Sequence, residues 1–171
     1  MTFAEQVLGF TQRAERRLAR TVSGAATKLA TNIIKATPID LPSGIRGLAW
    51  VPDFHDPDTV GRARGGWVAG LDTNLNSNNT PLDPTGDATS RNAAASYAAY
   101  SPRVHMTLYL VNTVGYIGKL EFGGYKFPDE NRNKSLPSGF SFQAPYGMMR
   151  VNTKTWPALV TNAARIARTV R

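Results

Sequence analysis

Three places in the sequence carry residue types that could support chemistry. Residues 53–58, Asp-Phe-His-Asp-Pro-Asp, gather three carboxylates and a histidine, which are the side chains of a metal or acid–base site. Such a site needs a second cluster that converges on the first, and the rest of the sequence marks none. We therefore interpret this segment as a solvated loop.

The other two places are equally incomplete. Ser138, Ser141, His105 and Asp87 supply the side chains of a Ser-His-Asp triad, but no Gly-x-Ser-x-Gly elbow accompanies them. The segment Gly-Arg-Ala-Arg-Gly-Gly at 61–66 lacks the Gly-Lys-Ser/Thr of a phosphate loop and precedes an expected strand rather than a helix. We predict that the chain is not an enzyme.

The composition also argues against cofactors and membrane spans. Cysteine is absent and there are only two histidines, so thiolate zinc sites are excluded and an all-protein transition-metal site is hard to build. We expect no cofactor. No apolar run approaches the roughly 20 residues that cross a bilayer. Glu5, Arg13 and Glu15 interrupt the N-terminus before the apolar core of a signal peptide could form. We expect a soluble protein, made in the cytoplasm, with no membrane partner.

The net charge of +8 is concentrated at the two ends of the chain. Residues 1–35 hold six basic residues against two acidic ones, and residues 150–171 hold five basic residues and no acidic one. This asymmetry favours a polyanion or an acidic partner; the alternative is a solvated helix face that uses arginine as a helix former. The basic residues that could contact such a polyanion, DNA in the reading given below, are Arg13, Arg16, Arg17, Arg20, Arg165 and Arg168.

The hydrophobic pattern predicts helices at both ends of a single α+β domain that covers residues 1–171. Apolar side chains recur every three or four positions from Phe3 to Ile33, which predicts one helix of about 30 residues. Pro38 should end it. An apolar face across 155–170 predicts a closing helix.

Between these helices we expect a small, mainly antiparallel sheet with an embedded helix. Strands are predicted at 66–71 and 104–112, the second from its alternation of side chains, and a short one at 148–152. An alanine-rich helix at 88–99 follows Asp87, which is placed to cap it. A short helical turn is predicted at 117–122.

Two long loops complete the expected organisation. Segment 41–60 is rich in Pro, Gly and Asp, with room for a short strand at 48–50, and segment 126–139 is polar with Pro and Gly. Loops of this length on a compact domain usually have a binding task. The sequence therefore favours an interaction protein, and a ring subunit that packs against its neighbours head to tail suits it well.

Four stretches resemble one protein family. ATPID (36–40) and GRARGGW (61–67) look like the Thr-Pro-Val-Asp-Thr-Gly-Arg-Ala-Arg-x-x-Trp signature of bacteriophage head–tail joining, or tail-completion, neck proteins. NTVGYIGKLEFGGY (112–125) and QAPYGMMRV (143–151) resemble that family's Asn-x-x-x-Tyr-x-x-x-Leu-Glu-x-Gly and Gln-Ala-Pro-x-Gly-Met block. The matching residues are Thr37, Pro38, Asp40, Gly61, Arg62, Arg64, Trp67, Asn112, Tyr116, Leu120, Glu121, Gly123, Gln143, Pro145, Gly147 and Met148. The loops at 41–60 and 126–139 are insertions relative to the family pattern.

The resemblance implies a structural virion protein of the phage neck, made in the host bacterial cytoplasm. It would form a homo-oligomeric ring of six subunits, with twelve as the alternative, between the portal-side connector or adaptor and the tail-terminator or tail-tube proteins. Double-stranded DNA would pass through the ring without sequence recognition. The alternative function is a sequence-independent or regulatory DNA-binding accessory protein, which would use the arginines of residues 13–20.

Two further expectations concern Glu121 and assembly. Glu121 lies between apolar neighbours, so we expect a semi-buried structural carboxylate that pairs with Arg62 or Arg64. We also expect the isolated protein to be monomeric or weakly associated, because most apolar residues are assigned to cores and little remains for an apolar interface.

Overall fold

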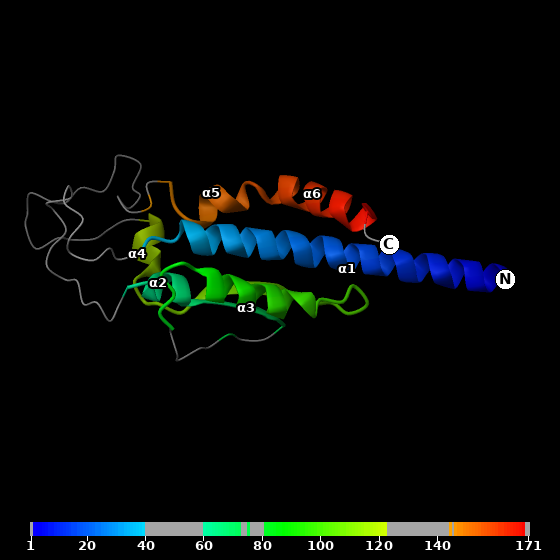
Figure 1. The fold of residues 1–171 in the computed structure, drawn as a ribbon, viewed down its shortest axis with the longest axis horizontal. Coiled ribbons are helices and arrows are strands. Elements are labelled where there is room, and N and C mark those ends of the chain that lie inside the picture. The colour runs from blue at the N-terminus through cyan, green and yellow to red at the C-terminus, as the bar shows by residue number, and fades with distance from the viewer. Residues whose placement is uncertain are drawn as a thin grey trace, which may run out of the picture.

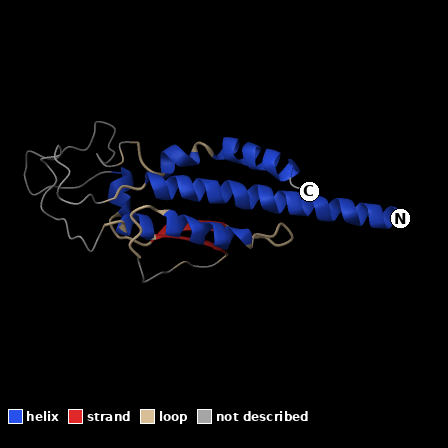
Figure 2. Ribbon diagram, in the orientation of Figure 1, coloured by secondary structure: helices blue, strands red, loops and turns tan. Residues whose placement is uncertain are grey.

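The computed structural model describes residues 2–39, 60–72, 75, 81–122, 144 and 146–169. In chain order these form α1 (Phe3–Ala36), α2 (Arg62–Gly65), β1 (Trp67–Leu71), α3 (Asp87–Ala98), β2 (Leu108–Asn112), α4 (Ile117–Phe122), α5 (Met149–Thr153) and α6 (Trp156–Thr169). α1 is the axis of the molecule, with α5 and α6 on one side and α3 with the two-stranded sheet on the other (Figure 1, Figure 2). The predicted α+β class is confirmed.

The two predicted insertions lie almost wholly outside the described residues. Only Val60 of segment 41–60 is described, and segment 126–139 is not described at all. The strand considered at 48–50 falls in the first of these segments.

α1 is a single helix of 34 residues, slightly longer than its apolar spacing predicted. It begins with a capping box in which Thr2 Oγ1 accepts a hydrogen bond from the Glu5 N–H and the Glu5 carboxylate accepts one from the Thr2 N–H. It ends at Ala36. Thr37 is extended, with ψ at 127°, because a residue before proline is disfavoured in the helical region. The predicted end before Pro38 is confirmed.

The main core forms where the C-terminal half of α1 meets α3 and β1. Its buried members are Ala26, Ala30, Ile33, Ile34, Trp67, Ala93 and Tyr97. Alanines on both facing helices allow their backbones to approach closely. α6 packs on another side of α1, where a Cβ added to Gly24 would lie 3.8 Å from Ala163 Cβ.

The sheet is one antiparallel pair in which Trp67 faces Asn112 and Leu71 faces Leu108. The alternation predicted for the second strand is confirmed where the strand exists, since Leu108 and Leu110 pack on the core while Tyr109 and Val111 are exposed. The strand begins at Leu108 rather than at residue 104.

The shorter strand has a local cause at Asp72. This residue turns into the left-handed region, with φ at 50°, and β1 ends just before it, at Leu71. The Asp72 N–H still donates to the Thr107 carbonyl at 3.0 Å. The Asp72 carboxylate accepts the Thr107 N–H in place of a ladder partner. The left-handed turn and this side-chain hydrogen bond together end the two-stranded ladder on this side.

The strand predicted at 148–152 is wrong, because these residues form helix α5, Met149–Thr153. A five-residue apolar segment gives no clear period, and its state depends on a distant residue described below. The predicted cap of α3 is also different. Asp87 is the first helical residue, and Asp83 accepts the N–H groups of Gly86 and Thr89.

The first turns of α1 extend beyond the other described elements (Figure 1), whereas later in the N-terminal half Glu15 contacts Arg103 and the end of α6 lies alongside. Phe3, Val7, Phe10 and Leu18 are all exposed there, Phe3 by 81% and Phe10 by 68%. We expected most apolar residues to serve cores, but these apolar side chains of α1 do not. An apolar face is free for an interface, contrary to the reasoning behind the expected weak association.

Candidate functional site

The residues of the family resemblance meet at the C-terminal end of α1. Thr37 is fully buried. Its hydroxyl donates a hydrogen bond to the Ile33 carbonyl and accepts one from the indole N–H of Trp67, and both hydrogen bonds are 2.8 Å long. The first residue of β1 is thus bonded to Thr37, the residue that follows α1, and this hydrogen bond joins the helix to the sheet.

Arg64 completes the junction from α2. Its Nε donates to the Thr37 carbonyl at 2.7 Å, and its two terminal nitrogens donate to the carbonyls of Pro84 and Lys35 at 2.6 and 3.0 Å. The last carbonyls of a helix lack partners within the helix, and a guanidinium fork can satisfy several of them at once. Burial lowers the pKa of Arg64 from its ordinary value, and the nearby Asp83 charge opposes this shift.

Asp83 ties the start of α3 to the same region. Its carboxylate accepts hydrogen bonds from the backbone N–H groups of Gly86 and Thr89 and from the hydroxyls of Thr85 and Thr89. Burial opposes ionisation of Asp83, but the hydrogen bonds outweigh it and lower the pKa of Asp83 from its ordinary value. The residue is a buried, ionised helix cap.

A second group of motif residues surrounds α4 and the start of α5. Asn112 at the end of β2 donates its amide to the Ala63 carbonyl and accepts the Val114 N–H. Ala63, Leu120, Ala144 and Met148 form a small buried cluster against which Tyr116 packs. These contacts join α2, the end of β2, α4 and α5 into one unit.

Glu121 holds α5 in place. It is only 4% exposed, and its carboxylate accepts the backbone N–H groups of Met148, Met149 and Arg150 at 2.5, 3.0 and 3.1 Å. The prediction of a semi-buried carboxylate is confirmed in its burial, which is even more complete than expected. Its predicted partner is wrong, because the carboxylate binds the start of α5 and lies 3.9 Å from the Arg150 guanidinium instead of pairing with Arg62 or Arg64. The Arg150 guanidinium also stacks over the Phe122 ring at 4.5 Å.

Two glycines of the motifs have a conformational reason. Gly61 precedes α2 with φ at +83°, and Gly147 precedes α5 with φ at +74°. A Cβ at Gly147 would come within 2.6 Å of Glu121 Oε1. Glycine is therefore required at 147 both for its backbone angle and for the approach of the carboxylate.

The structure brings most, but not all, of the motif residues together. Pro38 follows the junction directly, and Arg62 lies in α2 beside Arg64. Asp40, Gly123, Gln143 and Pro145 lie outside the described residues. Within the described part, every buried side-chain nitrogen or oxygen has a hydrogen-bond partner. These polar groups are used to hold elements together, so the site functions as a structural joint.

The two catalytic candidates in the described part of the chain, Asp87 and His105, lie toward opposite ends of α3. Asp87, at the start of α3, is half exposed and forms an ion pair with Lys35 at 3.0 Å. His105 is exposed and follows the other end of α3, a helix of 12 residues and thus about 18 Å long. Ser138, Ser141 and segment 53–58 lie outside the described residues.

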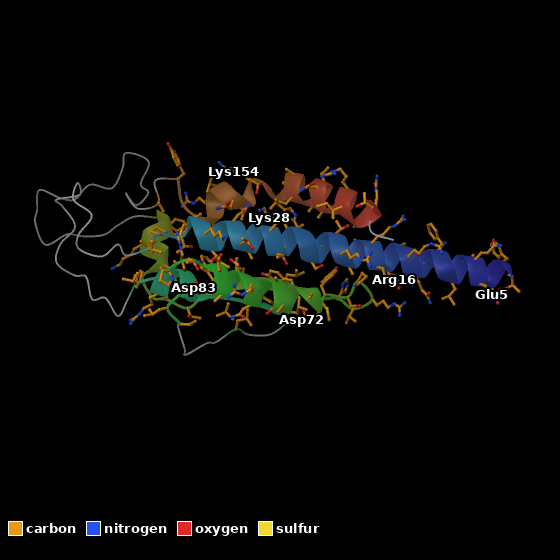
Figure 3. All side chains as sticks on the ribbon, viewed as in Figure 1. Glu5, Arg16, Lys28, Asp72, Asp83 and Lys154 are labelled. Carbon is orange, nitrogen blue, oxygen red and sulfur yellow. The ribbon has the colours of Figure 1, made fainter. Side chains whose placement is uncertain are left out.

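The candidate DNA-facing arginines lie on two neighbouring helices. α6 runs back along α1, so its C-terminal end lies beside the N-terminal half of α1 (Figure 1, Figure 3). The six side chains are all exposed: Arg13, Arg16, Arg17, Arg20, Arg165 and Arg168. This half of the molecule therefore presents a cationic surface formed by both terminal helices.

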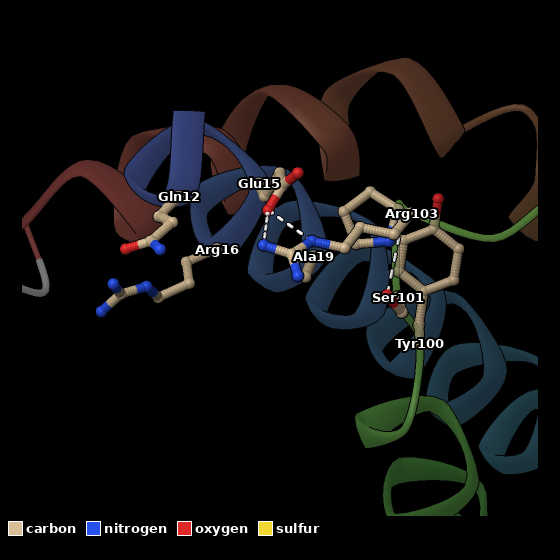
Figure 4. Close-up of a pocket in the computed structure, with 8 residues that line it drawn as sticks. Gln12, Glu15, Arg16, Ala19, Tyr100, Ser101 and Arg103 are labelled. Atoms are coloured by element: carbon tan, nitrogen blue, oxygen red, sulfur yellow. Dashed lines mark hydrogen bonds and ion pairs between the residues drawn. The ribbon is translucent and has the colours of Figure 1, made fainter. Parts of the chain in front are cut away.

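A hollow of about 460 Å³ adjoins this surface and was not predicted. Its lining residues are Gln12, Glu15, Arg16, Ala19, Tyr100, Ser101, Pro102 and Arg103. Arg103 holds the Glu15 carboxylate through Nε at 2.7 Å and Nη2 at 2.6 Å (Figure 4). The hydrogen bond to Glu15 raises the pKa of Arg103. The two residues are 88 positions apart, and no sequence pattern links them.

Comparisons with known family models, curated proteins and solved structures give no match to the chain. In the described residues, no three His, Cys, Asp or Glu side chains gather as metal ligands would. None of the described helices combines the length and the apolar character needed to cross a membrane.

Proposed function

We propose that this chain is a structural subunit of a bacteriophage neck. It would form a ring of six copies, with twelve as the alternative, that joins the head connector to the tail around the DNA channel. The observation that carries the proposal is the cationic surface: two adjacent helices expose six arginines on the same half of the molecule. Such a surface suits contact with DNA phosphates without reading the bases.

The joint at the other end of α1 supports the same proposal. Residues that match the neck-family motifs form hydrogen bonds that hold α1, the sheet and α5 together. A ring subunit needs this kind of rigid scaffold, because its neighbours must meet it at fixed angles.

Localisation on the particle tests the proposal directly. Antibodies raised against the purified chain should label tailed particles of the phage that encodes it at the head–tail junction, and a density map of that junction should contain six or twelve copies. Absence of the chain from purified particles would refute the proposal.

The alternative, a DNA-binding accessory or regulatory protein, uses the same arginines on α1. DNA titrations at several salt concentrations separate the two. A channel subunit should bind unrelated duplexes equally and weakly, with an affinity that falls steeply with salt. Replacing Arg13, Arg16, Arg17 and Arg20 by glutamine should reduce the salt dependence, whereas Arg91→Gln on α3 should not. A strong preference for one sequence favours a regulator.

A further inference from the structure

The N-terminal half of α1 carries an apolar stripe made of Phe3, Val7, Phe10, Ala14 and Leu18. Their spacing of three and four residues places them on one helix face. All five are exposed, from 47% at Val7 to 81% at Phe3 among the four large side chains. Large exposed side chains aligned in this way mark an interaction surface.

The stripe continues a face of α1 that is buried further along the helix. Val7 and Ala25 are separated by about five turns of 3.6 residues, so they point in the same direction. Ala25 is only 1% exposed, and a Cβ added to the adjacent Gly24 would lie 3.8 Å from Ala163 Cβ of α6. α6 thus occupies the neighbouring part of this face and ends where the stripe begins (Figure 1). The stripe is therefore a second surface of α1 on which a helix could pack, in line with the surface on which α6 packs.

The charges along the stripe define the chemistry of its partner. Arg13 and Arg17 follow Phe10 and Ala14 by three residues, so they border one edge of the stripe. Both are exposed. On the other side of α1, Glu15 is held by Arg103. A partner with acidic side chains beside its apolar residues would complement this edge.

Other occupants fit less well. A second copy of this basic chain would bring arginine against arginine along the edge. A flat bilayer cannot lie along the stripe, because α6 stands on the same face of the same straight helix. DNA offers no apolar surface that could cover two exposed phenylalanines.

We propose that the apolar stripe of α1 is the docking site for an amphipathic helix of a partner protein, and that this helix carries acidic side chains beside its apolar face. The partner helix lies along α1 and continues the line of α6. Arg13 and Arg17 belong both to this edge and to the proposed DNA-facing set. The test uses the isolated protein without DNA, so its result does not depend on whether the chain is a neck subunit.

A pair of synthetic peptides tests the proposal. Each has 18 residues, leucine at heptad positions a and d, and either glutamate or lysine at every e and g position, so that like charges prevent self-pairing. Fluorescence anisotropy with the full chain should show that the glutamate peptide binds at least about tenfold more tightly than the lysine peptide. Arg13→Glu with Arg17→Glu should reverse this preference.

Single substitutions locate the binding site. Phe10→Ala should weaken the glutamate peptide by at least about tenfold, because central aromatic residues dominate such interfaces. Leu8→Ala is the matched control, since Leu8 is 58% exposed on the same part of α1 but points away from the stripe. It should change affinity by less than about twofold. Far-UV circular dichroism checks that each variant keeps its helices.

Four results would overturn the proposal. The first is no binding of the glutamate peptide, and the second is equal affinity for both peptides. The third is self-association in analytical ultracentrifugation that Phe10→Ala abolishes, which would assign the stripe to a second copy. The fourth is binding to vesicles of phosphatidylserine and phosphatidylcholine that depends on Phe10, which would assign it to a membrane.

Discussion

Removal of the Glu121 carboxylate should destabilise the fold strongly, because this side chain holds the start of α5. Its two oxygens accept three backbone N–H groups at the start of α5, and the side chain is nearly buried. Glu121→Ala leaves these donors without their acceptor. A lost helix cap costs about 0.5–2 kcal/mol, and an unsatisfied buried donor costs about 1–3 kcal/mol.

The expected loss for Glu121→Ala is therefore about 3 kcal/mol, with the exposed Arg150 contact adding little. Glu121→Gln keeps one acceptor oxygen and nearly the same shape, so it should lose about half as much. Urea denaturation followed by circular dichroism measures the free energy of unfolding of both variants. Glu5→Ala is the control, because it removes a carboxylate cap at the exposed start of α1 and should cost less than about 1 kcal/mol.

A free energy of unfolding of Glu121→Ala within about 0.5 kcal/mol of the wild type would contradict this role, since the three donors would then find water at no cost. An equal loss of stability in the alanine and glutamine variants would contradict it too. That result would mean that the volume of the side chain, rather than its acceptor oxygens, holds α5 against α4.

Three other changes test the remaining joints by urea unfolding or titration. Arg64→Lys should lose about 2 kcal/mol, because an ammonium group cannot reach all three carbonyls, while Arg91→Lys on α3 should change nothing; equal stability of both variants would contradict the role of the guanidinium fork. Because the pKa of Asp83 is lowered in the folded protein, the ionised carboxylate stabilises the fold above its ordinary pKa near 3.8, and this stabilisation is lost as the pH falls below that value. Asp83→Asn should therefore flatten the dependence of the unfolding free energy on pH between about pH 4 and pH 2. An unchanged slope in this variant would contradict the capping role of Asp83. Burial raises the pKa of Tyr97 to about 12, and its hydroxyl donates to the Tyr109 carbonyl, so Tyr97→Phe should cost about 1 kcal/mol and remove a late step from the alkaline absorbance titration.

Local pattern was sufficient to predict the longest elements. The spacing from Phe3 to Ile33 and the proline at 38 define α1, and no distant contact is needed to explain its bounds. The sequence predicts strands at 66–71 and 104–112, the second from its alternation, but the second strand begins only at Leu108, next to the turn at Asp72. The start of a strand depends on its neighbour, and the alternation in one segment does not contain that information.

The sequence identifies residues of the candidate site but does not predict which hydrogen bonds they form. Glu121 was correctly identified as a buried carboxylate, yet its donors lie 27 to 29 positions later in the chain. The same donors decide that residues 149–153 are helical, which their own sequence does not indicate. Thr37 and Trp67 were chosen by resemblance alone, and their hydrogen bond across 30 positions follows only from the packed fold.

The straightness of α1 has a mechanical consequence for its free end. Residues 3–18 extend about 24 Å, so a tilt of about 5° between α1 and its packed neighbours moves the tip by about 2 Å. The tilt is limited by Gly24, Ala26 and Ala30, small residues that bring the neighbouring helices close to the α1 backbone. The direction of the N-terminal end of α1 is thus set by small side chains far from that end. Larger residues at these positions would change the direction of the helix without altering the stripe itself.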